Sequence, residues 1–538
     1  MPLISSVPRL PRSRVAGRSL RDRAERAVRG SGIPDDLVAL WQGTDGVDQR
    51  TARAVIDLAM RVGETLLCTG ASASDVVATA LRLTDAYCLR SVHVDVTFTS
   101  ISVSYHRGPD ADPMTVMRGI TVRSTDFTRL ERLQTLVRDI SVEPVEIELA
   151  RARFDDLIKA PHPYRRWVVT ASLAGLAAAA AALFGGSWLI MVLSFGTTAA
   201  ADRVQHWLAR RGIAAFFTQA AGGAIPTLVA LALLAAASAG VPGLHGVSPS
   251  LVVASGIVVL LAGLFVVGAA QDAIDGYYVT ACARVFEVLV LTFGIVVGIT
   301  AVLAIAQRSG VSMKLTADTP LTANTLVQVL AAMVVSGMFA VSAYAGTRTV
   351  LYSTITGGLG WLVYLGATRV GMGPVAASSL AALAAGFLSQ VGARRLRVPA
   401  LALSTAAFVP LLPGLAVYRG LFEIVQRSPG EGLSTGLITL LGAAGVGMGL
   451  AAGVSMGAFL ARPIRWVNSR DSAAASLMAQ PRSCSINDGH ALCDRVHPRL
   501  KVNCQLARRA AARATASRIS RSTVAGRDRS AHVSLTNS

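Results

Sequence analysis

Four ionisable residues, Asp272, Asp275, Arg284 and Glu287, lie between two long apolar stretches of the chain. An ionisable side chain at the centre of a membrane helix costs about 2.5–3.5 kcal/mol on insertion scales, so such residues usually have a function. Asp272 and Asp275 would share one face of a helix, and Arg284 and Glu287 have the same spacing and could pair. The group could bind the ammonium and carboxylate of a zwitterion, or carry a coupling proton. The alternative is a solvated loop in which a salt bridge sets the helix register.

Pro413 and Gly414 form a second candidate site, because they interrupt another apolar stretch. Proline removes a backbone donor from a helix, and unwound backbone at membrane depth is tolerated where it lines a cavity. The pair therefore predicts a bend that binds substrate. A kink that only adjusts helix packing is the alternative.

The composition indicates which elements must position these residues. Hydrophobic residues make up 52% of the 538 residues and charged residues 15%, and the mean hydropathy is +0.51. A soluble protein is about a quarter charged, so an ordinary soluble enzyme is excluded, as is a disordered regulator. Ten apolar segments come close to the roughly 20 residues that cross a bilayer. They cover residues 167–184, 186–201, 214–239, 250–270, 284–306, 323–345, 350–368, 372–391, 398–418 and 434–460.

A repeated motif relates the two halves of this membrane region. Residues 260–266 (LLAGLFV) match residues 411–417 (LLPGLAV), an offset of five segments, with Ala262 in the position of Pro413. Five crossings reverse the direction of the chain, so the copies would cross the membrane in opposite senses. This predicts a 5+5 inverted repeat, residues 167–306 and 323–461, as in many secondary transporters. Chance similarity of two Leu/Gly-rich strings is the alternative.

The charge distribution predicts the orientation. The net charge of +19 is carried almost entirely by arginine, and eight arginines precede residue 30 without an apolar stretch that would make a signal peptide. With both termini in the cytoplasm, the inner loops carry more arginine and lysine than the outer ones, in accord with the positive-inside rule. Binding to nucleic acid is disfavoured, because no recognition motif accompanies the charge.

The regions outside the membrane segments differ from one another. Residues 49–160 alternate helix-like and strand-like patterns and predict a small cytoplasmic α/β domain. Its second helix should begin at Ser72, which caps the backbone three residues on. Residues 92–105 alternate apolar and polar side chains as a strand does, with an interruption expected near Thr99–Ser100. Residues 1–48 and 467–538 are basic, of low complexity, and are expected to be disordered. The six cysteines show neither a disulfide framework nor a zinc spacing, so no metal and no cofactor are expected.

Several short motifs, taken together, resemble the threonine/serine exporter family, in which a cytoplasmic domain precedes ten membrane segments. They are Gly63-Glu64-Thr65-Leu66-Leu67 with Gly70-Ala71-Ser72 and Asp75-Val76, then Leu183-Phe184-Gly185-Gly186, then Asp272 to Gly276 with Ala283-Arg284 and Glu287, and finally Leu412-Pro413-Gly414 with Tyr418-Arg419. Their order and spacing agree over roughly residues 50–460.

The resemblance implies export of threonine and serine by proton antiport in a bacterial plasma membrane, with both termini cytoplasmic and no enzymatic activity. Asp272, Asp275 and Glu287 are then candidates for proton coupling or ammonium binding, and Arg284 for binding a carboxylate or pairing with Glu287. Pro413, Gly414, Tyr418 and Arg419 complete the candidate set. The expected partners are the amino acid, protons and the lipid bilayer, and a homo-oligomer is compatible with the sequence.

Two alternatives remain at this point. The first is a dicarboxylate exporter of the same architecture, which the several acidic groups mildly disfavour. The second is a membrane-anchored hydrolase acting through residues 49–158, which the many membrane segments disfavour, because anchoring does not need them.

Overall fold

The computed structural model describes residues 48–89, 91–106, 112–120, 125–239, 249–260, 263–308, 324–396, 398–413, 416–417, 419–420, 423–424 and 431–461. The segments expected to be disordered, residues 1–48 and 467–538, lie outside the described residues except for Asp48.

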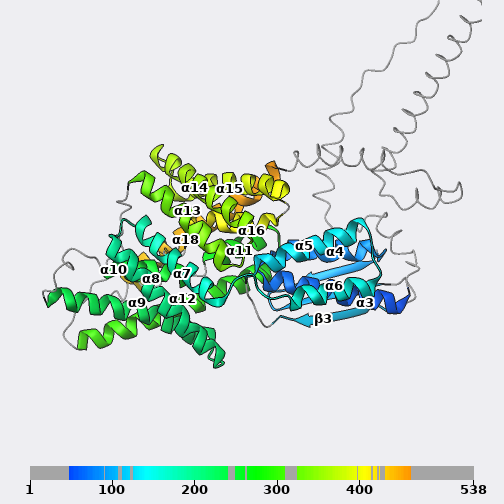
Figure 1. Ribbon diagram of the computed structural model, residues 1–538, viewed down its shortest axis with the longest axis horizontal. Helices are drawn as coiled ribbons and strands as arrows, with labels where there is room; N and C mark the ends of the chain where they lie inside the picture. The colour runs from blue at the N-terminus through cyan, green and yellow to red at the C-terminus, as the bar shows by residue number, and fades with distance from the viewer. Residues whose placement is uncertain are drawn as a thin grey trace, which may run out of the picture. The chain divides into compact units, whose positions relative to one another are not determined.

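The N-terminal described region combines four helices with one small sheet. The helices are α3 (Gln49–Cys68), α4 (Ala73–Ala86), α5 (Phe127–Val142) and α6 (Ile147–Lys159), and the strands are β1 (Val92–Val96), β2 (Ser100–Tyr105) and β3 (Met114–Gly119). The strands are antiparallel in the order β1-β2-β3, with Val94 opposite Val103. Figure 1 shows α3 to α6 grouped with these strands.

Local sequence explains where these elements begin. Asp48, Ser72 and Asp126 cap α3, α4 and α5, each accepting a hydrogen bond from a backbone N–H in the first turn. The predicted cap at Ser72 is thus confirmed. The predicted interruption near Thr99–Ser100 is also confirmed, because β1 and β2 are separate strands joined by a tight turn at residues 97–99.

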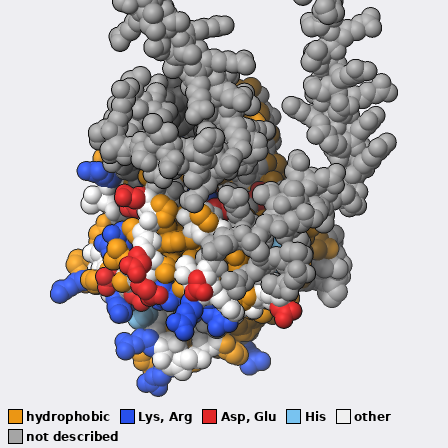
Figure 2. Space-filling model, turned by 90° about the vertical axis from the view of Figure 1, so that its right-hand side faces the viewer, with side chains coloured by type: hydrophobic (Ala, Val, Ile, Leu, Met, Phe, Trp, Pro, Cys, Tyr) orange, Lys and Arg blue, Asp and Glu red, His pale blue; other side chains and the backbone are white. Residues whose placement is uncertain are grey.

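Apolar side chains on one face of each helix form the core of this region. Leu58, Leu66, Ile101, Leu130 and Leu133 are fully buried there. On the outer surface, Arg151 of α6 pairs with Asp57 of α3, and acidic and basic side chains are interspersed with apolar ones on the face that Figure 2 shows. The core, rather than these exposed ion pairs, therefore supplies most of the stabilisation.

The rest of the described chain is helical. The helices are α7 (Arg166–Leu183), α8 (Trp188–Arg210), α9 (Ala215–Ser238), α10 (Pro249–Leu260), α11 (Gly263–Ile274), α12 (Tyr278–Arg308), α13 (Thr325–Ser342), α14 (Thr347–Arg369), α15 (Pro374–Leu396), α16 (Ala400–Phe408) with the 3-10 turn η1 (Val409–Leu411), and α18 (Glu431–Leu460). Within the described residues, seven helices are long and apolar enough to span a membrane, or eight if α10 and α11 form one bent span. The chain is therefore an integral membrane helical protein, and the count of ten spans stays a prediction.

The two further predicted spans coincide with helices that fail the same criterion. Helix α8 continues well past the predicted end at residue 201 and is less apolar, because it carries Asp202 and Arg203. The Asp202 carboxylate accepts hydrogen bonds from Arg166 and from the Thr170 hydroxyl, both on α7 and both at 2.6 Å. The polar part of α8 is thus satisfied by its neighbour. Helix α16 is short because the α-helical conformation ends at Phe408 and the 3-10 turn η1 follows.

Both predicted copies of the repeated motif coincide with a break in a helix. Helices α10 and α11 are inclined at 45° to one another across a short interruption. Helix α16 ends at Phe408, η1 follows, and Leu412 is extended with ψ of 135°. A residue that precedes proline avoids the helical region, so Pro413 accounts for the conformation of Leu412. The predicted break of this segment is confirmed.

Glycine allows two helix pairs to pack with their backbones in contact. A Cβ atom on Gly298 of α12 would lie 1.9 Å from the carbonyl oxygen of Ala220 on α9. A Cβ atom on Gly453 of α18 would lie 2.2 Å from the carbonyl oxygen of Ser379 on α15. Small residues at such contacts are how membrane helices gain packing energy without a hydrophobic driving force.

Candidate functional site

The centre of the candidate site is an ion pair between α11 and α12. The Nε atom of Arg284 lies 3.0 Å from Oδ2 of Asp272, and the two side chains are 7% and 0% exposed. Placing such charges out of water is costly unless each meets a partner. The sequence predicted that these residues belong to one cluster, and the structure identifies Asp272 as an acidic partner of Arg284.

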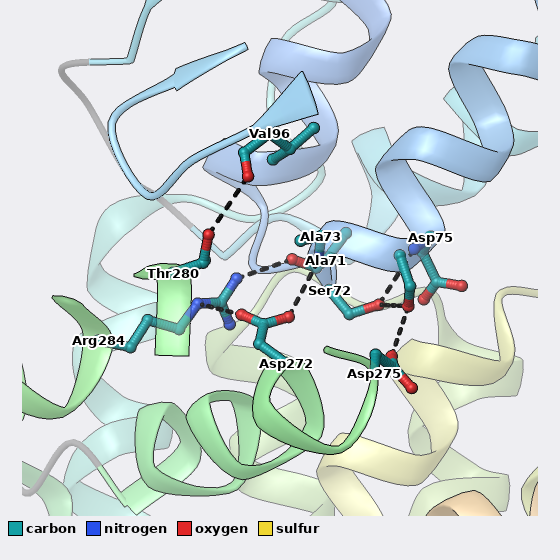
Figure 3. A network of polar contacts seen from close by, with 10 residues as sticks. Ala71, Ser72, Ala73, Asp75, Val96, Asp272, Asp275, Thr280 and Arg284 are labelled. Carbon is teal, nitrogen blue, oxygen red and sulfur yellow. Dashed lines mark hydrogen bonds and ion pairs between the residues drawn. The ribbon is translucent and has the colours of Figure 1, made fainter. Parts of the chain in front are cut away.

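The remaining partners of this pair come from the start of α4, about 200 residues earlier in the chain. The Ala73 N–H donates to Oδ1 of Asp272 at 3.0 Å, and Nη2 of Arg284 donates to the carbonyl oxygen of Ala71 at 3.0 Å (Figure 3). Because the first N–H groups of a helix lack intrahelical partners, a carboxylate is favoured there. The α4 N-terminus thus binds the acid while the preceding carbonyl binds the base.

Two glycine turns present these groups to each other. Gly70 has φ of +92° and ends α3, with the Ala71 N–H bonded back to the Leu66 carbonyl. Gly276 also has φ of +92° and ends α11, with the Tyr277 N–H bonded back to the Asp272 carbonyl. Both are Schellman turns, which need a residue at positive φ and therefore favour glycine.

Two further contacts lie beside the buried pair, an exposed one at Ser74 and a buried one at Thr280. The hydroxyl of Ser74 donates to Oδ2 of Asp275 at 2.6 Å, and the hydroxyl of Thr280 donates to the Val96 carbonyl at 3.3 Å. The Asp75 carboxylate retains solvent contact. Desolvation by the surrounding protein, followed by repulsion from Asp275, raises the pKa of Asp75 above its ordinary value of 3.8, against the lowering effects of Ser72 and Arg82.

This raised pKa predicts a pH-dependent stability. Because the pKa of Asp75 is raised in the folded protein, ionisation of its carboxyl group lowers the free energy of unfolding. This destabilisation is absent at a pH below 3.8, where the carboxyl group is protonated in both the folded and the unfolded protein, and it grows as the pH rises through the raised pKa. We expect Asp75→Asn to raise the melting temperature of the full-length protein at pH 7.5, and to raise it less at pH 4. Asp112→Asn, an exposed residue preceding β3, is the control. An equal gain at both pH values would contradict the assignment.

A cavity of about 280 Å³ lies next to the ion pair. The N-terminal region contributes the end of α3 with Cys68 and Thr69, the β1–β2 turn with Phe98, and Phe127. The membrane helices contribute Phe265, Gln271, Thr280, Arg284, Thr405 and Phe408. The cavity therefore lies where α11, α12 and the broken α16 meet the N-terminal region, and its wall includes one cation, Arg284, among polar and aromatic groups.

A second contact between the two regions is made by the α13–α14 turn. The Phe127 N–H donates to the Ala343 carbonyl at 2.9 Å, and the Tyr164 hydroxyl donates to the Ala345 carbonyl at 2.9 Å. The ring of His162 stacks on Tyr344 and its Nδ1 lies 2.8 Å from Asp126. The N-terminal region is therefore held to the membrane helices at two separate places.

The other predicted site residues have different surroundings. Glu287 is half-buried on α12, one turn beyond Arg284, and Asp275 is exposed. Pro413 is buried in the turn after η1, and Arg419 is half-buried in a short helical stretch. Gly414 and Tyr418 lie outside the described residues. The structure thus brings Asp272 and Arg284 into direct contact. Asp275 follows Asp272 by one helical turn, in the connection between α11 and α12.

Sequence reasoning missed the part of the site that the N-terminal region supplies. Phe98, Thr280 and Thr405 carry no pattern that separates them from structural residues. The stretch Gly70-Ala71-Ser72 was visible as a turn followed by a helix cap, but its contact with Asp272 was not.

Two family models match the chain. One, described as "Putative threonine/serine exporter", covers residues 57–306, and the other, described as "Threonine/Serine exporter, ThrE", covers residues 328–456. A relative from Mycobacterium tuberculosis named "Probable threonine/serine exporter" is 39% identical over 456 residues, covering 83% of this chain and 84% of the relative. This chain belongs to the threonine/serine exporter family.

A second member of the threonine/serine exporter family, named "Threonine/serine exporter" in Corynebacterium glutamicum, is 34% identical and covers 78% of this chain and 85% of its own length. No solved structure matches the chain. Members of the threonine/serine exporter family are transporters and not enzymes, and the apolar helices make this member a multi-pass membrane protein.

Proposed function

We propose that this protein exports threonine and serine from the bacterial cytoplasm and is driven by the proton motive force. The observation that carries the proposal is the cavity beside the buried Asp272–Arg284 pair, where broken membrane helices meet the N-terminal region. A guanidinium suits the carboxylate of an amino acid, and the names of the relatives supply the substrate class. Asp272, Asp275 and Glu287 remain the candidates for ammonium binding and proton coupling.

The packing of the helices supports ten spans arranged as a 5+5 inverted repeat. Helix α7 packs on α8 as α13 packs on α14, and α9 packs on α12 as α15 packs on α18. The broken helices correspond as well, because α10 contacts α7, α8 and α9, and α16 contacts α13, α14 and α15. In this arrangement α8 is the second span, α10 with α11 the fourth, and α16 the start of the ninth.

The contacts of the N-terminal region support the proposed orientation. This region touches the α11–α12 turn, the α13–α14 turn and the start of α16. In a ten-span arrangement these connections all lie on the side of the membrane where the chain's first span begins. Cytoplasmic termini therefore agree with the arginine-rich inner loops of the same arrangement.

The ion pair offers a simple form of proton coupling. Protonation of Asp272 removes the negative charge that faces Arg284, while the guanidinium stays charged. The ionised carboxylate of Asp272 can bind the ammonium group of an amino acid, whereas the protonated carboxyl group cannot. Proton and substrate therefore compete for Asp272, so that entry of a proton can be exchanged for export of the amino acid.

The function is tested by loading cells with a threonine-containing dipeptide and following extracellular threonine. We expect efflux to be faster in cells that carry the protein, and a protonophore to abolish the difference. Unchanged efflux, with the protein confirmed in the membrane, would contradict the substrate assignment. Export of succinate in the same cells would then favour the dicarboxylate alternative.

The coupling residues are tested separately with Glu287→Gln. We expect this variant to insert into the membrane normally and to lose threonine export, because a neutral amide cannot carry a proton at that position. Glu148→Gln, on the exposed surface of α6, is the matched control and should export at the wild-type rate. Normal export by both Glu287→Gln and Asp272→Asn would remove the proposed coupling site.

A further inference from the structure

We propose that the exported amino acid binds in the cavity between the N-terminal region and the membrane helices, so that this region forms part of the transport site itself. This inference rests on the proposed function and adds to it the place of the substrate. It also gives the N-terminal region a role, because the cavity is incomplete without residues from α3, the β1–β2 turn and Phe127.

The walls of the cavity carry the groups that a zwitterion needs. Arg284 provides a cation for the carboxylate, and the side-chain amide of Gln271 adds donors. The guanidinium is held in place by Asp272 and by the Ala71 carbonyl, so its orientation is set before a ligand arrives. Preorganisation of this kind reduces the entropy lost on binding.

Threonine hydroxyls around the cavity are suited to the ammonium group. Thr69, Thr280 and Thr405 each donate their hydroxyl hydrogen to a backbone carbonyl, those of Leu66, Val96 and Leu401 respectively. With the hydrogen used, each hydroxyl can only accept a further bond, and an ammonium has three donors. The same acceptors fit the hydroxyl of a threonine or serine substrate.

Size and apolar walls restrict the ligand. The volume of about 280 Å³ lies just below the range for small-molecule pockets, roughly 300–1,000 Å³. Phe98 and Phe127 from the N-terminal region, with Phe265 and Phe408 from the membrane helices, line the space. The site therefore favours a small zwitterion over a dianion, because Arg284 is the one cationic side chain among the described residues that line it.

Cys68 lines this cavity and allows occupancy to be measured directly. In full-length protein whose five other cysteines are replaced by serine, we expect threonine to slow alkylation of Cys68 by N-ethylmaleimide. At a threonine concentration ten times its Kd, the slowing should be about tenfold, because only the unoccupied fraction reacts. A matched protein that keeps only Cys88, which is exposed and away from the cavity, should react at the same rate with and without threonine.

The outcomes separate this inference from the proposed function. Protection of Cys68 by threonine and serine, but not by succinate, supports both. If the protein binds threonine in equilibrium dialysis and Cys68 is not protected, the cavity is excluded and the proposed function stands. If the protein binds no threonine and succinate protects Cys68, the amino-acid ligand and the proposed substrate are both overturned.

A substitution in the wall provides a second test that does not use a thiol reagent. Thr405→Val keeps the shape of the side chain and removes the acceptor, so we expect the Kd for threonine to rise roughly 10-fold to 100-fold. Thr356→Val is the matched control, because Thr356 is also a buried helical threonine that donates to the carbonyl four residues back, and it lies away from the cavity. Equal Kd values for Thr405→Val and wild type would overturn the placement.

Discussion

The Asp272→Ala variant is expected to lose about 3–5 kcal/mol of stability, because Arg284 is then left charged and buried without this acidic partner. The loss is that large because the Asp272 side chain is fully buried and the Ala73 N–H loses its acceptor in the same step. Chemical unfolding of the full-length protein in micelles measures the change. Hydrogen exchange at residues 69–76 should rise, since these residues hold the pair.

The control for this prediction is a similar ion pair on the surface. Arg151 lies 2.6 Å from Asp57, with side chains 30% and 39% exposed. Asp57→Ala should therefore cost no more than about 1 kcal/mol. Equal losses of stability for Asp272→Ala and Asp57→Ala would show that the buried pair contributes no more to stability than the exposed pair does.

The double variant Asp272→Leu/Arg284→Met separates stability from transport. A buried ion pair can often be replaced by apolar residues of similar volume without loss of stability. We expect the double variant to recover most of the stability lost by Asp272→Ala and to export no threonine. Recovered export would mean that the pair only holds the N-terminal region in place.

The second large effect is expected for Gly298→Val. Its Cβ would lie 1.9 Å from the carbonyl oxygen of Ala220, and backbone atoms cannot rotate away as a side chain can. Helices α9 and α12 must then separate, and overpacking of this kind costs about 1–3 kcal/mol or more. Thermal unfolding of the purified protein, together with its yield from membranes, checks the prediction.

Gly442→Ala on α18 is the control for the glycine substitution. No heavy atom lies within 4 Å of a Cβ built at this position, so the added methyl group should be accommodated. Alanine also favours the helix by roughly 0.5–1 kcal/mol over glycine. A gain for Gly442→Ala and a loss for Gly298→Val would confirm that close backbone approach, and not helix propensity, governs the α9–α12 contact.

Much of the fold could be predicted from local patterns alone. The apolar segments, the cap at Ser72, the strand alternation of residues 92–105 and the break before Pro413 depend on residues close together in the chain. A helix span or a cap is decided by its own few residues, because its hydrogen bonds close within a turn. Helix α8 is the exception, because hydropathy predicted that this segment ends at residue 201 and the helix continues to Arg210. Its polar residue Asp202 is accommodated by hydrogen bonds from α7, which hydropathy does not reveal.

The arrangement of the site depended on contacts between distant parts of the chain. Composition showed that Asp272 and Arg284 needed partners, but the Ala71 carbonyl and the Ala73 N–H are backbone groups, which every residue carries. Which carbonyl meets Arg284 depends on how the turn at Gly70 packs against α11 and α12. The aromatic and hydroxyl side chains of the cavity likewise become a site only through packing, since each alone resembles an ordinary core residue. Residue chemistry thus predicted the charges, and the three-dimensional packing chose their partners.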